Sequence, residues 1–307
     1  MSRLKHRLEY AAIRAVQLYL LAMPHRCALF NTWILAWLTF NLIGIGRAEA
    51  MRRIRQVLGQ TVPKCQVRRI AWLSWRNMCF NMTEMVRVTR ITPQWIKHHT
   101  SGMEEAMTFL KDQLAQHGGA IIAVAHMGNW DLAGVACRQA GIDIFSIAGK
   151  QKNPYVNRWL DGIRGHSMDV LERGSSALRI VLRRLQQGGV FAILPDVRMP
   201  VKDLDIDFLG ARANLGRGMA QFARRAQVPI LPVTLLRQGW AQHTVILHDP
   251  VLHDPTLERD ADLIRMTQIV ADHITAAVMK HPEQWFWYNR RWVLMPLKPK
   301  KQQQQTP

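Results

Sequence analysis

The order of apolar and polar residues changes character near residue 119. From there on, short apolar runs alternate with segments of helical periodicity. Such alternation is typical of a sheet with helices on its faces, so we expect an α/β fold with a mixed central sheet flanked by helices. Strands are predicted at 119–125, 143–148, 168–171, 190–194, 229–236 and 243–248. Helices are predicted at 131–140, 154–164, 175–187, 213–227 and 258–280.

The N-terminal region follows a different pattern. Residues 27–46 contain no charged side chain and are bracketed by Arg26 and Arg47. A helix of this length would span about 30 Å. Together with the apolar residues before Pro24, it predicts a helical membrane anchor, either a single span or a helical pair lying in the interface. A buried core helix and a cleaved signal peptide are the alternatives.

These patterns divide the chain into three parts. Residues 1–46 are the predicted anchor, and residues 47–297 form the main domain, which begins with the helical, basic stretch 47–110. The tail, 298–307, contains three lysines and four glutamines. A segment with so few apolar residues cannot bury a core, so we expect it to be disordered.

The charge of the chain narrows the possible partners. The 307 residues carry a formal net charge of +19, and residues 1–100 contain sixteen Lys and Arg against three acidic residues. A basic surface of this kind attracts anionic lipid headgroups, nucleic acid or an acidic protein; a merely solvated surface is the alternative. No nucleic-acid motif accompanies it, so we do not expect nucleic-acid binding.

The four cysteines show no C-x-x-C pairing. We therefore predict neither a disulfide framework nor a zinc site. Small buried thiols of this kind suit a reducing, cytoplasmic compartment.

One segment combines residue types that support acid–base chemistry. His126 follows an apolar run, and Asp131 comes five residues later at the start of a predicted helix. A neutral imidazole can accept a proton from a hydroxyl, and a carboxylate on its other nitrogen fixes the tautomer. Gly128 and Asn129 favour a turn that brings Asp131 back towards His126, and both are candidates for substrate contact. We predict His126 as a general base oriented by Asp131, with a structural histidine and an N-capping aspartate as the alternative.

Four further residues are candidates for substrate binding. Lys150 follows the second predicted strand, and Arg164 ends the next helix, where a guanidinium can clamp a phosphate. Asp196 closes the strand at 190–194, and strand ends on one edge of a sheet gather sites, so we expect it near His126. Gly210 lies in a glycine-rich approach to a predicted helix whose amides can hold an anion. Solvated surfaces, a loop cap and ordinary loop glycines are the alternatives.

Taken together, these segments resemble the late acyltransferases of bacterial lipid A biosynthesis (the lauroyl/myristoyl type), within the lysophospholipid acyltransferase-like superfamily. The superfamily motif is His-x-x-x-x-Asp/Glu, and this branch has His-x-Gly-Asn-Trp-Glu. Here the motif occupies residues 126–131, with Asp131 in place of Glu. The resemblance covers nearly the whole chain. Further blocks follow in the family's order: Asn153-Pro154 to Arg164, Pro195-Asp196, Phe208-Leu209-Gly210 with Ala213 and Gly216, and Pro282-x-Gln284-x-x-Trp287-x-x-Arg290-Arg291.

The resemblance implies a glycerol-phosphate acyltransferase-like fold and a membrane-bound O-acyltransferase. It implies acyl transfer from a thioester of acyl carrier protein or coenzyme A to a hydroxyl of a lipid A precursor, with Arg164 contacting phosphate. It implies no cofactor and no metal. The site would lie on the cytoplasmic face of a bacterial inner membrane. Because Asp131 departs from the branch, another glycolipid or a lysophospholipid stays open as the acceptor; a non-catalytic, basic membrane-surface protein is the other alternative.

Overall fold

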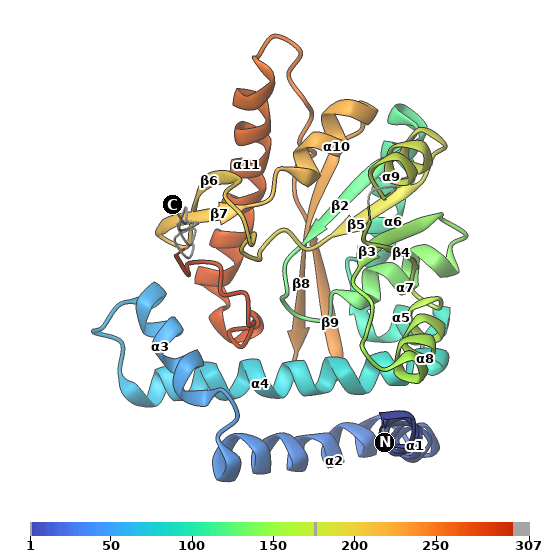
Figure 1. Ribbon diagram of the computed structural model, residues 1–307, viewed down its shortest axis with the longest axis vertical. Coiled ribbons are helices and arrows are strands. Elements are labelled where there is room, and N and C mark those ends of the chain that lie inside the picture. Colours follow the sequence, from blue (N-terminus) through green and yellow to red (C-terminus); the bar gives the residue numbers. More distant parts are fainter. Residues whose placement is uncertain (1, 175–176, 297–307) are drawn as a thin grey trace, which may run out of the picture.

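The computed structural model describes residues 2–174 and 177–296. The N-terminal region is helical, as its pattern predicts. Figure 1 shows α2 and α4 side by side at one end of the molecule, with α1 next to α2. The helices are α1 (Ser2–Ala22), α2 (His25–Leu38) with a π-helical turn at Thr39–Ile43, α3 (Arg47–Leu58), α4 (Lys64–Val86) and α5 (Pro93–His99). A buried hydrogen bond of 2.7 Å between the hydroxyls of Thr32 and Thr83 joins α2 to α4.

The predicted mixed sheet is present. Its seven strands lie in the order β1-β9-β8-β2-β5-β3-β4. Neighbouring strands are parallel except β8 and β9, which are antiparallel. All six predicted strands are confirmed; the seventh, β1, has two residues, too few for a periodicity to reveal it. The strands are β1 (Thr100–Ser101), β2 (Ala120–Val124), β3 (Ile144–Ala148), β4 (Asp169–Glu172), β5 (Val190–Ile193), β8 (Ile230–Gln238) and β9 (Gln242–Leu247).

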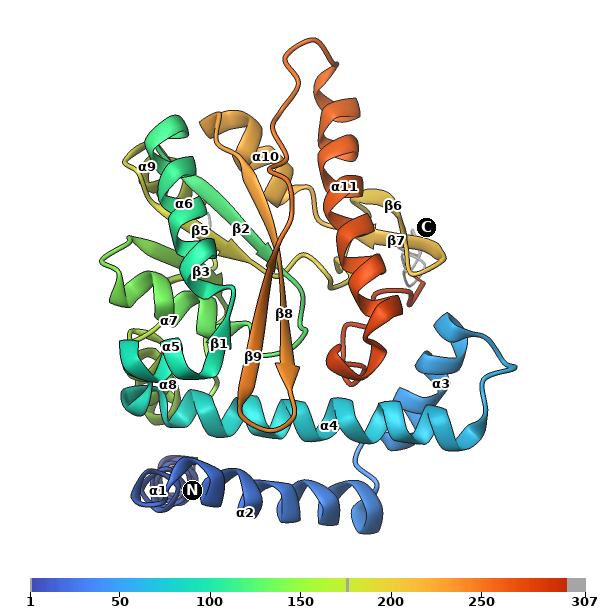
Figure 2. The same cartoon turned by 180° about the vertical axis from the view of Figure 1, so that it is seen from behind.

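Helices cover both faces of this sheet (Figures 1 and 2). One face carries α6 (Met103–His117), α7 (Asp131–Gln139) and α8 (Pro154–Arg164). The other carries α9 (Ala177–Gln186), α10 (Gly218–Ala226) and α11 (Arg259–Lys280). All five residues of β2 are buried, as expected for a central strand of a parallel sheet covered on both sides. Adjacent residues point to opposite faces, so Ile121 and Ile122 belong to two different core clusters.

A separate hairpin corrects one prediction. Strands β6 (Leu204–Phe208) and β7 (Ala211–Leu215) pair antiparallel. Leu209 and Gly210 form the two-residue turn, with φ of 52° and 77°, and this kind of hairpin turn needs positive φ at both positions. The helix predicted at 213–227 is therefore wrong at its start, because α10 begins only at Gly218. The first two residues of the helix predicted at 175–187, and the tail at 298–307, lie outside the described residues.

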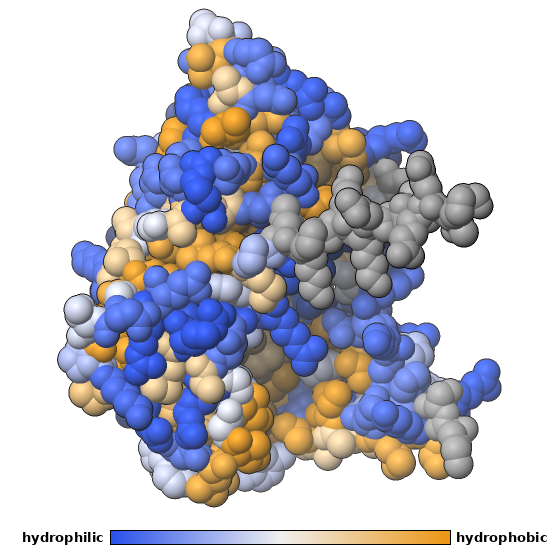
Figure 3. All heavy atoms as spheres, turned by 60° about the vertical axis from the view of Figure 1, so that its left-hand side comes forward, coloured by the Kyte–Doolittle hydropathy of each residue, from blue (hydrophilic) through white to orange (hydrophobic). Residues whose placement is uncertain are grey.

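The described part of the predicted anchor consists of α1, α2 and the π-helical turn that follows α2. Within the described ranges, no single helix has the length and hydropathy of a membrane span. The pair His25–Ile43 and Arg47–Leu58 meets that test only jointly, across a bend of 88°. Apolar side chains are nevertheless exposed along α1, α2 and the turn after them, and Figure 3 shows apolar surface along this lower edge of the molecule. Examples are Leu8, Leu35, Leu42 and Ile43.

Candidate active site

The predicted histidine lies where the central strand ends. Strand β2 stops at Val124, and His126 follows in the loop from β2 to α7, which contacts Asn81 and Glu84 of α4. The backbone of this loop is held by the C-terminal segment. Phe286 N–H donates to His126 O (2.9 Å), and Gly128 N–H donates to Gln284 O (3.2 Å). The loop is thus fixed from a part of the chain some 160 residues away in sequence.

Asp196 is the acid that orients His126. One carboxylate oxygen, Oδ1, lies 2.7 Å from His126 Nδ1, while Oδ2 accepts the His126 backbone N–H at 2.8 Å. Trp285 Nε1–H donates to the same Oδ2 at 2.8 Å. Asp196 is 3% exposed. With Nδ1 engaged, Nε2 is the ring nitrogen available for substrate chemistry.

This geometry corrects the predicted role of Asp131. In the described residues no hydrogen bond joins Asp131 to His126, so Asp131 does not orient the imidazole. The reason is the strand register. Ala123 of β2 pairs with Ile193 of β5, so His126 and Asp196 stand at equivalent positions beyond two adjacent parallel strands. The turn at 128–129 instead carries Asp131 onward to the first residue of α7, where its N–H donates to Asn129 Oδ1 (3.3 Å).

The charges of this site shift its pKa values. Burial disfavours the imidazolium, but the Asp196 carboxylate outweighs burial and raises the pKa of His126. Burial also opposes ionisation of Asp196, yet the charge and hydrogen bond of His126 hold the pKa of Asp196 below its ordinary value. For Asp131, burial dominates and raises the pKa, against the opposing effects of Arg164 and His126. Each member of the His126–Asp196 pair therefore favours the charged form of the other.

A cavity of about 340 Å³ opens beside this pair. His126, Trp130, Asp131 and Arg164 line it. The Trp130 ring meets the imidazole edge to face, with 5.2 Å between centroids. The remaining lining is largely apolar and comes from the sheet and from α4, with Met85, Val124, Ile144, Val170 and Leu194 among its members. A base, a cation and an apolar wall thus share one space.

The other predicted residues are distributed between this cavity and the surface. Arg164, the last residue of α8, lines the cavity, and the Asn153 side chain caps that helix at its other end. Lys150 lies on the surface, where its Nζ is 2.7 Å from Glu172 Oε1. Gly210 is exposed in the hairpin turn and does not precede a helix. The roles of Gly128 and Asn129 in substrate contact stay predictions.

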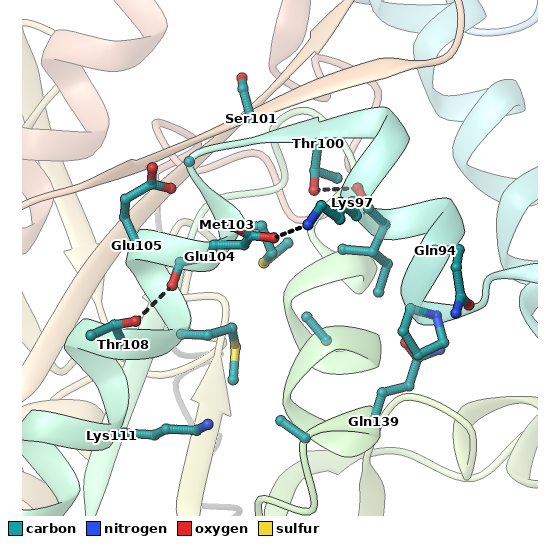
Figure 4. A pocket seen from close by; sticks show the side chains of 16 residues that line it. Gln94, Lys97, Thr100, Ser101, Met103, Glu104, Glu105, Thr108, Lys111 and Gln139 are labelled. Atoms are coloured by element: carbon teal, nitrogen blue, oxygen red, sulfur yellow. Dashed lines mark hydrogen bonds and ion pairs between the residues drawn. The ribbon is translucent and has the colours of Figure 1, made fainter.

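A second, larger cavity of about 750 Å³ lies between α5, α6 and α7. Figure 4 shows its rim, where Lys97 and Glu104 form an exposed ion pair of 3.4 Å. Met103, which is buried, and the partly exposed Met107 are among its lining residues. Its described lining includes none of the predicted site residues. The histidine of the His126–Asp196 pair lines the smaller cavity instead.

The sequence is similar to those of known acyltransferases. The model of the family described as bacterial lipid A biosynthesis acyltransferase matches residues 2–293. The chain belongs to this family. Among curated relatives, the phosphatidylinositol mannoside acyltransferase of Mycobacterium tuberculosis (strain H37Rv) is 22% identical over 68% of this chain. The relative of that name in Mycolicibacterium smegmatis is 22% identical over 57% of it. The chain spans 66% and 57% of the lengths of these two relatives, less than two thirds of each.

Some residues of the site lie in sequence motifs and others do not. The family motif locates His126, and the closing motif contains Gln284. The motif does not indicate that Asp196 contacts His126 Nδ1, because that contact depends on the pairing of β2 with β5. Trp285, which donates to Asp196, and Glu84, which accepts from Asn129, were not predicted. Glu84 is one of only three acids in the first hundred residues, and that was the only available signal.

Proposed function

We propose that this protein transfers a fatty acyl chain from an acyl thioester to a hydroxyl of a phosphorylated glycolipid. The observation that carries the proposal is the His126–Asp196 pair in the wall of a largely apolar cavity. Family membership supports acyl transfer. The family is named for lipid A and the relatives for phosphatidylinositol mannoside, which are both phosphorylated glycolipids.

In the proposed reaction, His126 Nε2 removes the proton from the acceptor hydroxyl. The hydroxyl oxygen attacks the thioester carbonyl, and the tetrahedral intermediate collapses with cleavage of the C–S bond. The thiolate then takes the proton from the imidazolium. Asp196 holds Nδ1–H throughout and stabilises the cation. Such general base catalysis contributes typically about 10²–10⁴-fold in rate.

An apolar path beside the site suits the acyl chain. Ile122 and Ala133 line both the active-site cavity and a narrow apolar pocket next to it. That pocket in turn shares Met103 and Met107 with the larger cavity in Figure 4. Methionine side chains adapt readily to an apolar ligand. We propose that the acyl chain extends from the thioester carbon along this path.

The polar end of the acceptor would bind beside Arg164. A guanidinium recognises phosphate through paired, charge-assisted hydrogen bonds, and Arg164 lines the cavity next to Asp131. The donor would be acyl carrier protein or acyl-coenzyme A, which are both anionic, and a chain of net charge +19 suits either.

We further propose that the protein binds the cytoplasmic face of the bacterial inner membrane through α1 and α2. Exposed apolar side chains on these helices are interspersed with Arg3, Lys5, Arg7 and Arg14. Amphipathic helices with basic residues bind anionic interfaces without crossing them. This placement would bring a lipid acceptor to the site by lateral diffusion.

Lipid mass spectrometry tests the proposal. We would compare cells lacking the gene with cells expressing the wild-type protein or His126→Ala. The wild-type protein should add one acyl chain to a phosphorylated glycolipid, and His126→Ala should add none. Identical lipid profiles in all three strains would refute the proposal. An extra chain on a lysophospholipid would refute the glycolipid acceptor while retaining acyl transfer.

A further inference from the structure

A buried ion pair, Glu84 with Arg237, contacts the loop at 125–130 that carries His126. Glu84 of α4 is 1% exposed, and Arg237 of β8 is 3% exposed. Arg237 Nη2 donates to Glu84 Oε2 at 2.5 Å, and Arg237 Nη1 donates to Glu84 Oε1 at 3.0 Å. Two more basic side chains approach Oε1, with His25 Nε2 at 3.3 Å and His243 Nε2 at 3.6 Å.

These groups keep Glu84 charged. Burial alone would favour the neutral acid, but Arg237, His243 and His25 hold the pKa of Glu84 well below its ordinary value. A buried ion pair is weak evidence for a stabilising role, because desolvation offsets most of its attraction. The contacts of Glu84 with the loop indicate a different role.

The network holds the two residues that follow His126 and Met127. Asn129 Nδ2 donates to Glu84 Oε2 at 2.7 Å. This orients the amide so that Asn129 Oδ1 accepts the Asp131 N–H. One helical turn earlier on α4, Asn81 Nδ2 donates to Gly128 O, and Asn81 Oδ1 accepts from Arg237 Nη2 at 2.6 Å. The loop is therefore fixed at consecutive residues by the same buried network.

We propose that Glu84 is a positioning residue for His126. It fixes Asn129 directly and Gly128 through Arg237 and Asn81, and so keeps the imidazole against Asp196. This inference rests on the proposed function for its kinetic consequence only, since the position of His126 can be measured without turnover. The same network explains a structural role for Gly128 and Asn129 of the motif, since it contacts both residues.

The test compares Glu84→Gln with a matched control in the full chain. Glutamine preserves the size of the side chain but removes the charge. Asp262→Asn is the control, because Asp262 is also fully buried and paired with two arginines, Arg224 and Arg265, but lies on α11. The primary readout is the NMR titration of His126 in protein carrying isotope-labelled histidine, assigned with His126→Ala.

In Glu84→Gln the His126 titration should move to lower pH, because a displaced loop loosens the contact with Asp196 that raises this pKa. The kcat for acyl transfer should fall about tenfold or more, with KM for the donor changing less. Asp262→Asn should lower the unfolding temperature but keep the wild-type titration and kcat. A wild-type His126 titration in Glu84→Gln would overturn the inference.

A second variant tests the inference if Glu84→Gln does not fold. Asn129→Ala leaves the ion pair intact and removes the amide that links Glu84 Oε2 to the loop and accepts the Asp131 N–H. It should shift the His126 titration in the same direction. An unshifted titration in folded Asn129→Ala would also overturn the inference. If wild-type protein shows no acyl transfer at all, the proposed function fails, while the titration still decides the positioning role.

Discussion

At the scale of single residues, Asp196 does more than accept one hydrogen bond from the His126 ring. Its two carboxylate oxygens hold the imidazole and the backbone N–H of His126, and Trp285 fixes the carboxylate in turn. The same acid therefore sets the tautomer, the ring orientation and the pKa of the base. Asp131 lies near enough for its charge to raise the pKa of His126 slightly, but it makes no hydrogen bond to the ring within the described residues.

Asp196→Asn should consequently lower kcat by about 10²–10⁴-fold, because the general base loses its tautomer and its counter-charge. A general base must be neutral, so the rate falls as the pH drops through the pKa of His126. Asp196 raises that pKa, so the acid limb of the pH profile should move to lower pH in the variant. Asp131→Asn should reduce kcat less. A larger loss in Asp131→Asn would contradict the assignment.

The sequence draws attention to His126, the proposed base, but it does not identify the acid that contacts the ring. His126 stands in a motif, and Asp196 was expected nearby because it closes a strand. Which acid meets Nδ1 follows from the pairing of β2 with β5, and this pairing is a tertiary contact that local patterns do not contain. The spacing from His126 to Asp131 suggested a nearer partner, but the intervening turn leads into α7 instead.

At the scale of elements, the conformation of the loop at 125–130, which carries His126, depends on Gly128. Its φ is +57°, a conformation that L side chains rarely adopt. A Cβ added there would lie 2.1 Å from Leu235 O and 2.6 Å from Leu235 C. The loop can therefore approach β8 this closely only with glycine.

Gly128→Ala should destabilise the protein by about 3 kcal/mol or more, through the backbone clash and the positive φ together. Gly141→Ala is the control, since Gly141 has a φ of +75° but no heavy atom within 4 Å of its added Cβ. That variant should lose only about 1 kcal/mol. Denaturant unfolding of both proteins measures the difference. Equal losses would show that the close approach to Leu235 does not matter.

Most elements of the sheet and its helices follow from the apolar pattern, because buried strands such as β2 and β5 form continuous apolar runs. The β6–β7 hairpin was missed for a physical reason. Its turn, Leu209-Gly210, places a leucine at positive φ, and leucine gives no signal for such a turn. The glycines nearby were instead interpreted as the approach to a helix.

At the scale of the whole molecule, one face combines apolar exposure with positive charge. More than half of the large apolar side chains that are exposed in the described residues precede residue 46. The structure also shows α2 attached to α4 and α1 to α8, where Trp159 Nε1 donates to Gln17 Oε1 at 2.8 Å. Deleting residues 1–46 would therefore expose the surfaces of α4 and α8 that α2 and α1 cover, and it would also remove the proposed membrane contact.

Point substitutions give a cleaner test of that contact. Leu35→Lys with Leu42→Lys should reduce binding to vesicles of mixed zwitterionic and anionic lipids at least about tenfold, because two leucines leave the bilayer interface. These side chains are 61% and 71% exposed, so folding should be unaffected. Leu252→Lys, in the loop after β9, is the control and should bind normally. Undiminished sedimentation of the double variant with vesicles would contradict the proposed membrane face.

The most direct test of the account is the rate of acyl transfer by purified His126→Ala with a defined acyl thioester and a glycolipid acceptor. We expect a loss of about 10²–10⁴-fold relative to the wild-type protein, with unchanged unfolding temperature and vesicle binding. Transfer at the wild-type rate by the folded variant would contradict the assignment of His126 as the general base.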